Sequence, residues 1–166
     1  EGMIMDFLDK TSCSPRLYMW SRDFIFMEYL GECISIEQVL THTLLDRKYH
    51  VLYRVLLKTF TTLYLLDFMG IDHGELNRPY NHILWCNNSV KIIDWESSRF
   101  SRKTHNLTSF TSYLINRFKY SDQLLEITGI DREDVISLLK SYKKKPSIRE
   151  LNAIIKLLVQ PLLQIS

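Results

Sequence analysis

The sequence is short of the features that mark several large classes of protein. Its 166 residues include only 5 glycines, 4 prolines and 3 cysteines, and the formal net charge is +2. The scarcity of glycine and proline excludes a fibrous or low-complexity chain. The near-neutral charge gives no broad attraction to nucleic acid, which we do not expect as a partner. No apolar run approaches the ~18 residues that a membrane span requires, so no membrane partner is expected either.

The cysteines are too few and too scattered to predict a disulfide framework. Cys13, Cys33 and Cys86 are odd in number and contain no C-x-x-C pair. Reduced cysteines in an intracellular, cytoplasmic protein are the simplest interpretation. We find no stretch with the pattern of a secretory signal, which agrees with that expectation.

What the chain does have is the composition of a globular domain. Apolar residues make up 46% of the sequence and aromatic residues 12%. Periodicity predicts helices near 3–8, after Ser35, over 47–69, and near 105–118, 132–142 and 147–164. It predicts strands at 16–20, 24–29, 83–86 and 90–93. We therefore expect an α+β chain with a mainly helical second half.

Three local signals refine the ends of these helices. Gly70 should stop the long helix over 47–69. Ser147 and Glu150 form the S-x-x-E pattern of a capping box. Pro161 should kink or end the last helix, because proline lacks an amide hydrogen.

One stretch gathers most of the polar side chains that could carry chemistry. It reads DHGELNRPYNHILWCNNSVKIIDWESSR over residues 72–99. A His-Gly-Glu triplet precedes the predicted hairpin, and an Asp-Trp-Glu follows it. The pattern places two carboxylates, Glu75 and Asp94, on either side of a small hairpin.

Taken alone, these signals also have plain structural interpretations. A lone His-Gly-Glu is most often a polar turn, and Asp94 could cap the turn after a strand. His73, His82 and Cys86 offer zinc ligands, although histidines beside a hairpin more often bond backbone. The His-x-Glu spacing also occurs in zinc deaminases, but their P-C-x-x-C segment is missing here. The basic run 143–145 is typical of a solvated loop, with nucleic-acid contact the minority interpretation.

The order of the features nevertheless resembles the protein-kinase-like fold. MEYLG, a long helix, DHGEL with NHIL, a hairpin and IIDWE follow one another between Glu1 and about Leu114. The chain is most similar to small archaeal predicted Ser/Thr protein kinases, which are distantly related to aminoglycoside and choline kinases. The resemblance implies an α+β protein-kinase-like fold, with a truncated N-terminal β-lobe and a mostly helical C-terminal lobe.

The resemblance also implies a division of the chain. Residues 1–166 would form a single kinase-like domain, in which 1–31 are the remnant of the N-lobe and the hinge. Residues 32–166 would form the C-lobe, with the catalytic loop at 72–84 and the metal-binding segment at 92–96.

Catalytic roles carry over to the His-Gly-Glu loop. Glu75 stands where kinases have the catalytic carboxylate, so it would accept or orient the proton of the attacking hydroxyl. His73 would belong to the same catalytic loop, and Arg78 would orient a substrate phosphate through its guanidinium.

Metal-binding roles carry over to the far side of the hairpin. Asp94 would hold Mg²⁺ across the ATP phosphates. Either Asn81 or His82 would serve a second metal, because Tyr80 occupies the position where kinases have an asparagine.

Nucleotide-binding roles carry over to the start of the chain. FMEYLG resembles the hinge strand, in which Met27 would be the gatekeeper and the backbone of Glu28 and Leu30 would bond the adenine edge. Met27 is expected in the core on any interpretation. Glu1 stands where the glutamate of the kinase αC helix would be.

The chain departs from the kinase pattern in two ways. The catalytic carboxylate is Glu rather than Asp, and its extra methylene displaces the group by about 1 Å, a misplacement that can cost on the order of 100-fold in rate. Neither a G-x-G-x-x-G loop nor a lysine resembling that of the third kinase strand is present.

We therefore expect an ATP- and Mg²⁺-dependent phosphotransferase, in the first place a Ser/Thr protein kinase acting on a protein hydroxyl. The missing lysine favours an inactive pseudokinase that serves as a binding module. His-Gly-Glu and Ile-Asp-Trp-Glu favour a kinase for a small-molecule hydroxyl acceptor of the aminoglycoside or choline type. An incomplete β-lobe would expose strand edges, so pairing into a homodimer is also open.

Overall fold

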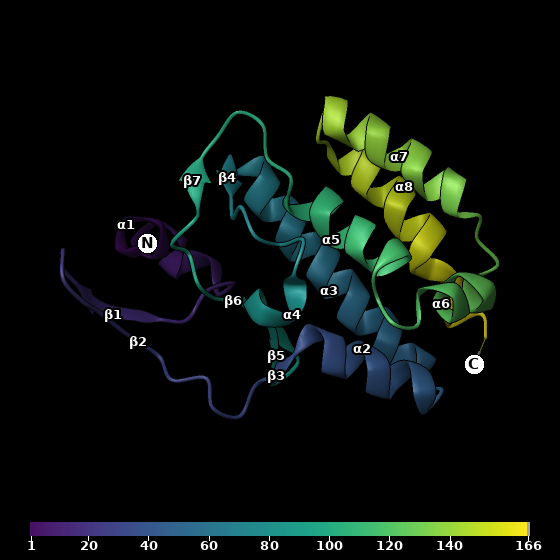
Figure 1. Ribbon diagram of the computed structural model, residues 1–166, viewed down its shortest axis with the longest axis horizontal. Helices are drawn as coiled ribbons and strands as arrows, with labels where there is room; N and C mark the ends of the chain where they lie inside the picture. The colour runs from purple at the N-terminus through teal and green to yellow at the C-terminus, as the bar shows by residue number, and fades with distance from the viewer. Residues whose placement is uncertain (166) are drawn as a thin grey trace.

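The computed structural model describes residues 1–165 as a chain in which helices predominate over short strands (Figure 1). The elements in chain order are α1 (Gly2–Leu8), a 3₁₀ turn (Asp9–Thr11), β1 (Leu17–Trp20), β2 (Ile25–Met27), β3 (Ile34–Ser35), α2 (Ile36–Leu45), α3 (Tyr49–Phe68), β4 (Ile71–Asp72), α4 (Pro79–His82), β5 (Ile83–Cys86), β6 (Ser89–Ile92), β7 (Arg99–Phe100), α5 (Asn106–Asn116), α6 (Ser121–Thr128), α7 (Arg132–Lys144), α8 (Ile148–Leu158) and a 3₁₀ turn (Gln160–Leu163). The predicted α+β class is confirmed.

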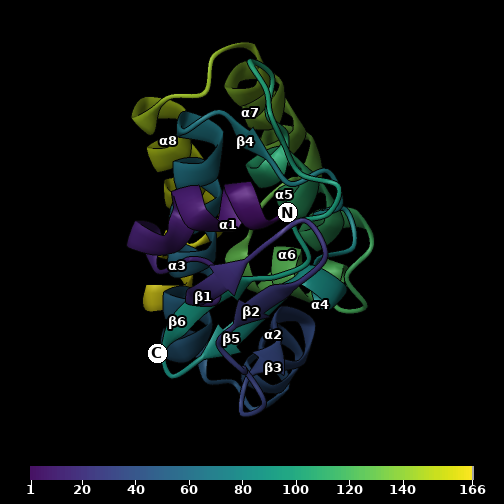
Figure 2. The same cartoon turned by 90° about the vertical axis from the view of Figure 1, so that its left-hand side faces the viewer.

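Within these residues the strands form three small antiparallel sheets. β1 pairs with β2, β3 pairs with β5 and β5 with β6, and β4 pairs with β7. The β1–β2 hairpin lies beside α1 at one end of the molecule (Figure 2). The other two sheets hold the segment between α3 and α5, which carries most of the predicted site.

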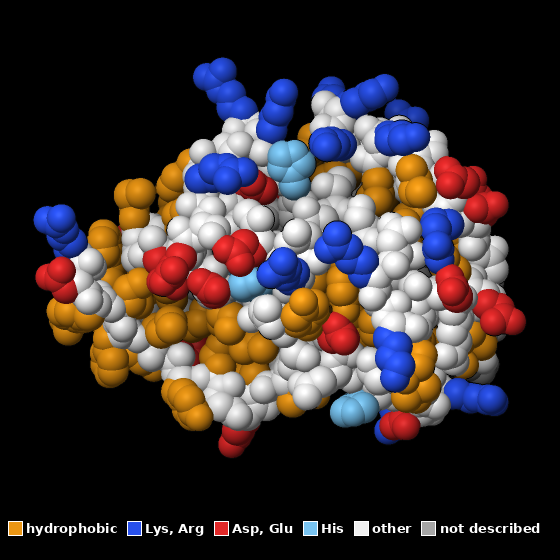
Figure 3. Space-filling model, in the orientation of Figure 1, with side chains coloured by type: hydrophobic (Ala, Val, Ile, Leu, Met, Phe, Trp, Pro, Cys, Tyr) orange, Lys and Arg blue, Asp and Glu red, His pale blue; other side chains and the backbone are white. Residues whose placement is uncertain are grey.

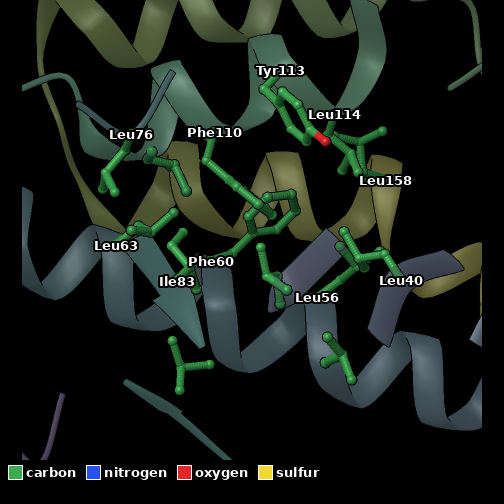
Figure 4. Packing of buried hydrophobic residues seen from close by; sticks show 14 of the residues in the cluster. Leu40, Leu56, Phe60, Leu63, Leu76, Ile83, Phe110, Tyr113, Leu114 and Leu158 are labelled. Atoms are coloured by element: carbon green, nitrogen blue, oxygen red, sulfur yellow. The ribbon is translucent and has the colours of Figure 1, made fainter. Parts of the chain in front are cut away.

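α3 is the central helix, and its apolar stripe organises the core. Phe60 is fully buried on this stripe and meets Phe110 of α5 edge to face, with ring centroids 5.8 Å apart. Figure 4 shows Leu76 and Ile83 in the same packed cluster. Leu76 directly follows Glu75, so the core fixes the loop that bears this carboxylate. Gly70 ends the helix with φ +71, as predicted.

Short-range signals in the sequence predicted the start of α2 and, to within one residue, the turn of the hairpin. Ser35 is the N-cap of α2, where its hydroxyl accepts from the Gln38 amide at 3.3 Å and its amide donates to the Gln38 side chain at 3.1 Å. Asn87 and Asn88 have φ values of +45 and +65, the left-handed pair that a two-residue hairpin turn requires.

The C-terminal third needs two corrections. α6 was not expected, because its eight residues are too few to show a clear helical period. The predicted capping box is wrong, since the Ser147 hydroxyl donates to the Glu150 carboxylate and bonds no helix amide. The predicted break at Pro161 is confirmed, because α8 ends at Leu158.

The expectation of reduced cysteines is wrong for Cys33 and Cys86, which form a disulfide. β3 and β5 pair with Ile34 opposite Trp85, and this register sets the flanking cysteines side by side, with Cα atoms 4.6 Å apart. The sequence hides the pair, because 53 positions separate the two residues. Cys13 is a buried free thiol. The cytoplasmic compartment stays a prediction.

The β1–β2 hairpin is poorly covered. Met27 is 41% exposed, so the expectation that it belongs to the core is wrong. Its neighbours share that exposure: Tyr18, Met19, Trp20, Phe24 and Phe26. Within residues 1–165 no helix is both long and apolar enough to cross a bilayer, and the 20-residue α3 has the length without the apolar character.

Candidate functional site

The hairpin brings the two predicted carboxylates together. β5 and β6 pair with Ile83 opposite Ile92, so the start and end of the hairpin are neighbours. The Ile93 amide donates to the His82 carbonyl at 3.0 Å, which extends this pairing by one step. Glu75 enters from the loop before α4, and Asp94 follows directly after Ile93.

Glu75, His82 and Asp94 form one compact group. His82 Nε2 lies 3.4 Å from Glu75 Oε2, and His82 Nδ1 lies 3.5 Å from Asp94 Oδ2. One ligand atom from each residue can be chosen so that all lie within 4.8 Å of one another. The side chains of Glu75 and Asp94 are 46% and 49% exposed, whereas that of His82 is 5% exposed. The imidazole of His82 therefore forms the buried base of the site, and the two carboxylates above it are in contact with solvent.

This donor set suits a divalent cation. Carboxylate oxygens are ligands for Mg²⁺, and an imidazole nitrogen extends the set toward transition metals such as Mn²⁺. His82 Nδ1 is buried without a hydrogen-bond partner in the part of the chain described. A buried polar atom of this kind needs a partner, and a metal ion would supply one. Figure 3 shows acidic side chains gathered on this face.

The backbone turns sharply at Asp94, whose φ is +65. This left-handed conformation is uncommon for a residue other than glycine. The next residue anchors it, because the fully buried Trp95 donates from its indole to the Ile92 carbonyl at 3.0 Å. The Trp95 amide donates to Glu1 Oε1 at 3.2 Å. Glu1 therefore contacts the predicted metal-binding segment directly.

His73 lies beneath the site rather than in it. The side chain is fully buried, and its Nε2 lies 3.0 Å from the Ile93 carbonyl oxygen. That oxygen can only accept, so Nε2 carries the hydrogen. Burial lowers the pKa of His73, which keeps the ring neutral. Because it cannot touch a substrate, His73 acts as a positioning residue that ties the loop to the hairpin.

Glu75 is held in its ionised form. The Ser97 hydroxyl donates to Glu75 Oε1, and this hydrogen bond holds the pKa of the carboxyl below its usual value. Nearby His82 and Arg78 act in the same direction. Arg78 itself is exposed, as is Asn81, and the structure brings His82 rather than Asn81 into the group with the carboxylates.

A buried network that we did not predict supports the loop. Asn106 Oδ1 accepts from the His73 amide at 2.9 Å, while Asn106 Nδ2 donates to Asp67 Oδ1 at 2.8 Å and to the Ile71 carbonyl at 2.6 Å. Tyr142 donates its hydroxyl to Asp67 at 2.8 Å. Burial raises the pKa of Asp67 even though these donors oppose the shift. The sequence did contain one signal for this network, because Asp67 is an acidic residue on the apolar stripe of the long helix.

The predicted hinge lies apart from the carboxylate group. The Glu28 amide donates to the Arg16 carbonyl at 2.8 Å, and the Glu28 carboxylate accepts from the Arg16 amide at 3.0 Å and lies 3.4 Å from Lys91 Nζ. Glu28 and Leu30 line a cavity of about 540 Å³ that contains neither Glu75 nor Asp94.

Comparisons with known proteins identified no relative of this chain. No model of a known protein family matches the chain, and no curated protein matches it either.

Proposed function

We propose that the chain is a protein-kinase-like phosphotransferase that uses ATP and a divalent cation, with a Ser/Thr hydroxyl of a protein as the first-choice acceptor. The observation that carries this proposal is the convergence of Glu75, His82 and Asp94 at the base of the hairpin. Phosphoryl transfer needs positioning and neutralisation of charge more than covalent chemistry from the protein. A small polar group of this kind can provide both.

The three side chains divide the work. Asp94 and His82 would hold the cation, Mg²⁺ or Mn²⁺, which when bound would neutralise the phosphate charge. Glu75 is ionised and half-exposed, so it can accept a hydrogen bond from an incoming hydroxyl and orient it. A carboxyl with a lowered pKa is a weak base, which fits a role dominated by orientation.

The start of the chain offers polar atoms for the nucleotide. The Glu28 carbonyl and the Leu30 amide make no hydrogen bond within residues 1–165, which leaves both free for an adenine edge. Glu1, by contacting Trp95, links the first helix to the cation-binding segment.

One observation favours the alternative of an inactive binding module. Glu28 and Leu30 line a cavity that contains neither carboxylate, so a nucleotide would have to reach from one place to the other. A pseudokinase could keep the fold and lose the transfer.

A transfer assay separates the active enzyme from the binding module. The full chain would be incubated with γ-labelled ATP, Mg²⁺ or Mn²⁺, and a panel of Ser/Thr peptides and small alcohols. We expect label on an acceptor, and a loss of about 100-fold or more in Glu75→Gln. Glu126→Gln is the control, because Glu126 is an exposed acid of α6 that lies outside both the group and the segment 92–96. An unchanged rate in Glu75→Gln, or no transfer to any acceptor by a chain that binds ATP, would reject the proposal.

A further inference from the structure

A groove between α5 and α7 lies next to the candidate site. Its volume is about 570 Å³, and its walls include Asn77, Ser109, Ser112, Arg117, Lys140 and Lys143. Volumes of this size are typical of ligand-binding clefts. Lys143 lies in the last turn of α7, so the basic run begins on a helix rather than in the loop predicted for it.

The walls of the groove are basic. Within the described chain none of the lining residues is acidic, and Arg117, Lys140 and Lys143 form no ion pair there. By contrast, Arg132 at the start of the same helix lies 2.6 Å from Asp122. Figure 3 shows Lys and Arg side chains over the α5 and α7 side of this face, apart from the acidic group at the hairpin. An anion would find three unpaired cations.

The groove is continuous with the loop that carries Glu75. Asn77, two residues beyond Glu75, lines it. A smaller cavity of about 220 Å³ shares Asn77 and Ser109 with the groove and extends to Gly74. A ligand seated along α5 would therefore place its near end at the catalytic loop.

The dimensions suit an extended peptide. The lining runs from His105, the N-cap of α5, to Arg117 at its other end. The 11 residues of α5 span about 16 Å, the length of about five residues of extended chain. Lys140 and Lys143 are one helical turn apart, about 5–6 Å between Cβ atoms. Alternate side chains of an extended peptide are about 7 Å apart, so two acidic residues could each meet one lysine.

We propose that the α5–α7 groove binds an acidic peptide segment flanking the hydroxyl that receives the phosphate. The transfer step rests on the proposed function, whereas binding of the peptide does not. The groove would select protein acceptors with acidic residues on one side of the Ser or Thr.

Binding can be measured without ATP. A fluorescent peptide with one Ser followed by alternating Glu residues would be titrated with the full chain and followed by anisotropy. We expect binding that weakens with salt, and no binding of the same peptide with Lys in place of Glu. The double variant Lys140→Glu, Lys143→Glu should lose affinity by about tenfold or more, because it removes two charge-assisted hydrogen bonds and puts repelling charges in their place.

The control is Lys144→Glu with Lys145→Glu, which makes the same charge change at the same end of α7 outside the groove lining. All four lysines are exposed, so folding should be unaffected. The control should bind within about threefold of the wild type. Equal losses of affinity in both double variants would overturn the proposal, and so would a lack of binding of the acidic peptide. A phosphorylated polyol is a competing anion for the same lysines. The proposal would also be overturned if this polyol bound more tightly than the peptide and displaced it.

Transfer assays then separate this inference from the proposed function. If the acidic peptide binds but receives no phosphate from ATP, the proposed phosphotransferase activity is rejected and the proposed peptide-binding groove is kept. If Ser peptides receive phosphate with no preference for acidic flanking residues, the proposed role of the groove is rejected and the phosphotransferase activity is kept.

Discussion

The pKa of Glu75 is lowered mainly by one hydrogen bond, which the Ser97 hydroxyl donates to its carboxylate. We predict that Ser97→Ala raises the Glu75 pKa toward the ordinary value of about 4.3, because the hydroxyl that favours the ionised form is gone. A carbon-detected NMR titration of the carboxyl would measure the shift. Ser98→Ala is the control, since Ser98 donates to the Trp95 carbonyl instead. An unmoved Glu75 titration in Ser97→Ala would contradict this account.

The same bond links the Glu75 pKa to folding stability. A carboxyl with a lowered folded-state pKa contributes stability that is present above the ordinary pKa and is lost as pH falls through the lowered one. Wild type and Ser97→Ala should therefore differ in melting temperature at neutral pH and converge at acidic pH.

At the residue scale the sequence placed Glu75 and Asp94 correctly relative to the hairpin, because strand pairing alone brings the two ends together. It left Asn81 and His82 undecided, since the direction of a side chain in the short α4 depends on packing. In the described chain His82, buried under the carboxylates, lies with them and Asn81 does not, while a role of either residue as a metal ligand stays a prediction.

At the scale of elements, Asn106 joins α5 to the His-Gly-Glu loop. We predict that Asn106→Ala lowers the free energy of unfolding by about 2–4 kcal/mol, because it leaves the Asp67 carboxylate and the His73 amide short of partners in a buried place. Urea denaturation would measure the loss. Asn116→Ala, which removes one exposed bond to the Ser112 carbonyl, should cost less than about 0.5 kcal/mol. Equal costs for the two variants would contradict the role of the network.

The elements that the sequence predicted are those with local causes. The stripe of α3, the Ser35 cap and the turn of the hairpin depend on neighbours in the chain. The predicted strands left 87–89 for this turn, one residue more than the structure uses. The two-residue strands β3, β4 and β7 have no such signal, because they exist only where distant segments meet. The Asp67–Asn106 contact escaped prediction for the same reason.

At the scale of the whole molecule, the Cys33–Cys86 bond joins the segment before α2 to the hairpin of the site. We predict that the unfolded, unreduced chain shows one reactive thiol and the reduced chain all three. Reduction should cost about 2–4 kcal/mol, since the bond closes a long loop. Thiol titration in denaturant, followed by urea unfolding with and without reductant, measures both. Three reactive thiols without reductant would contradict the bond.

The exposure of Met27 shows the limit of prediction at this scale. A β-type run predicts a strand but not what covers its faces. β1 and β2 pair only with each other among the described residues. Several of their apolar side chains, Met27 among them, are exposed because no other element packs over them. Homodimer formation stays a prediction.

The central claim is that Glu75, His82 and Asp94 form one site, in which His82 and Asp94 bind a cation that works with ATP. Calorimetric titration of ATP into the full chain, with and without Mg²⁺ or Mn²⁺, tests it most directly in the wild type, Asp94→Asn and Glu126→Gln. We predict binding that requires the cation, falls about tenfold or more in Asp94→Asn and persists in Glu126→Gln. ATP binding that ignores the cation, or that is unchanged in Asp94→Asn, would contradict the claim.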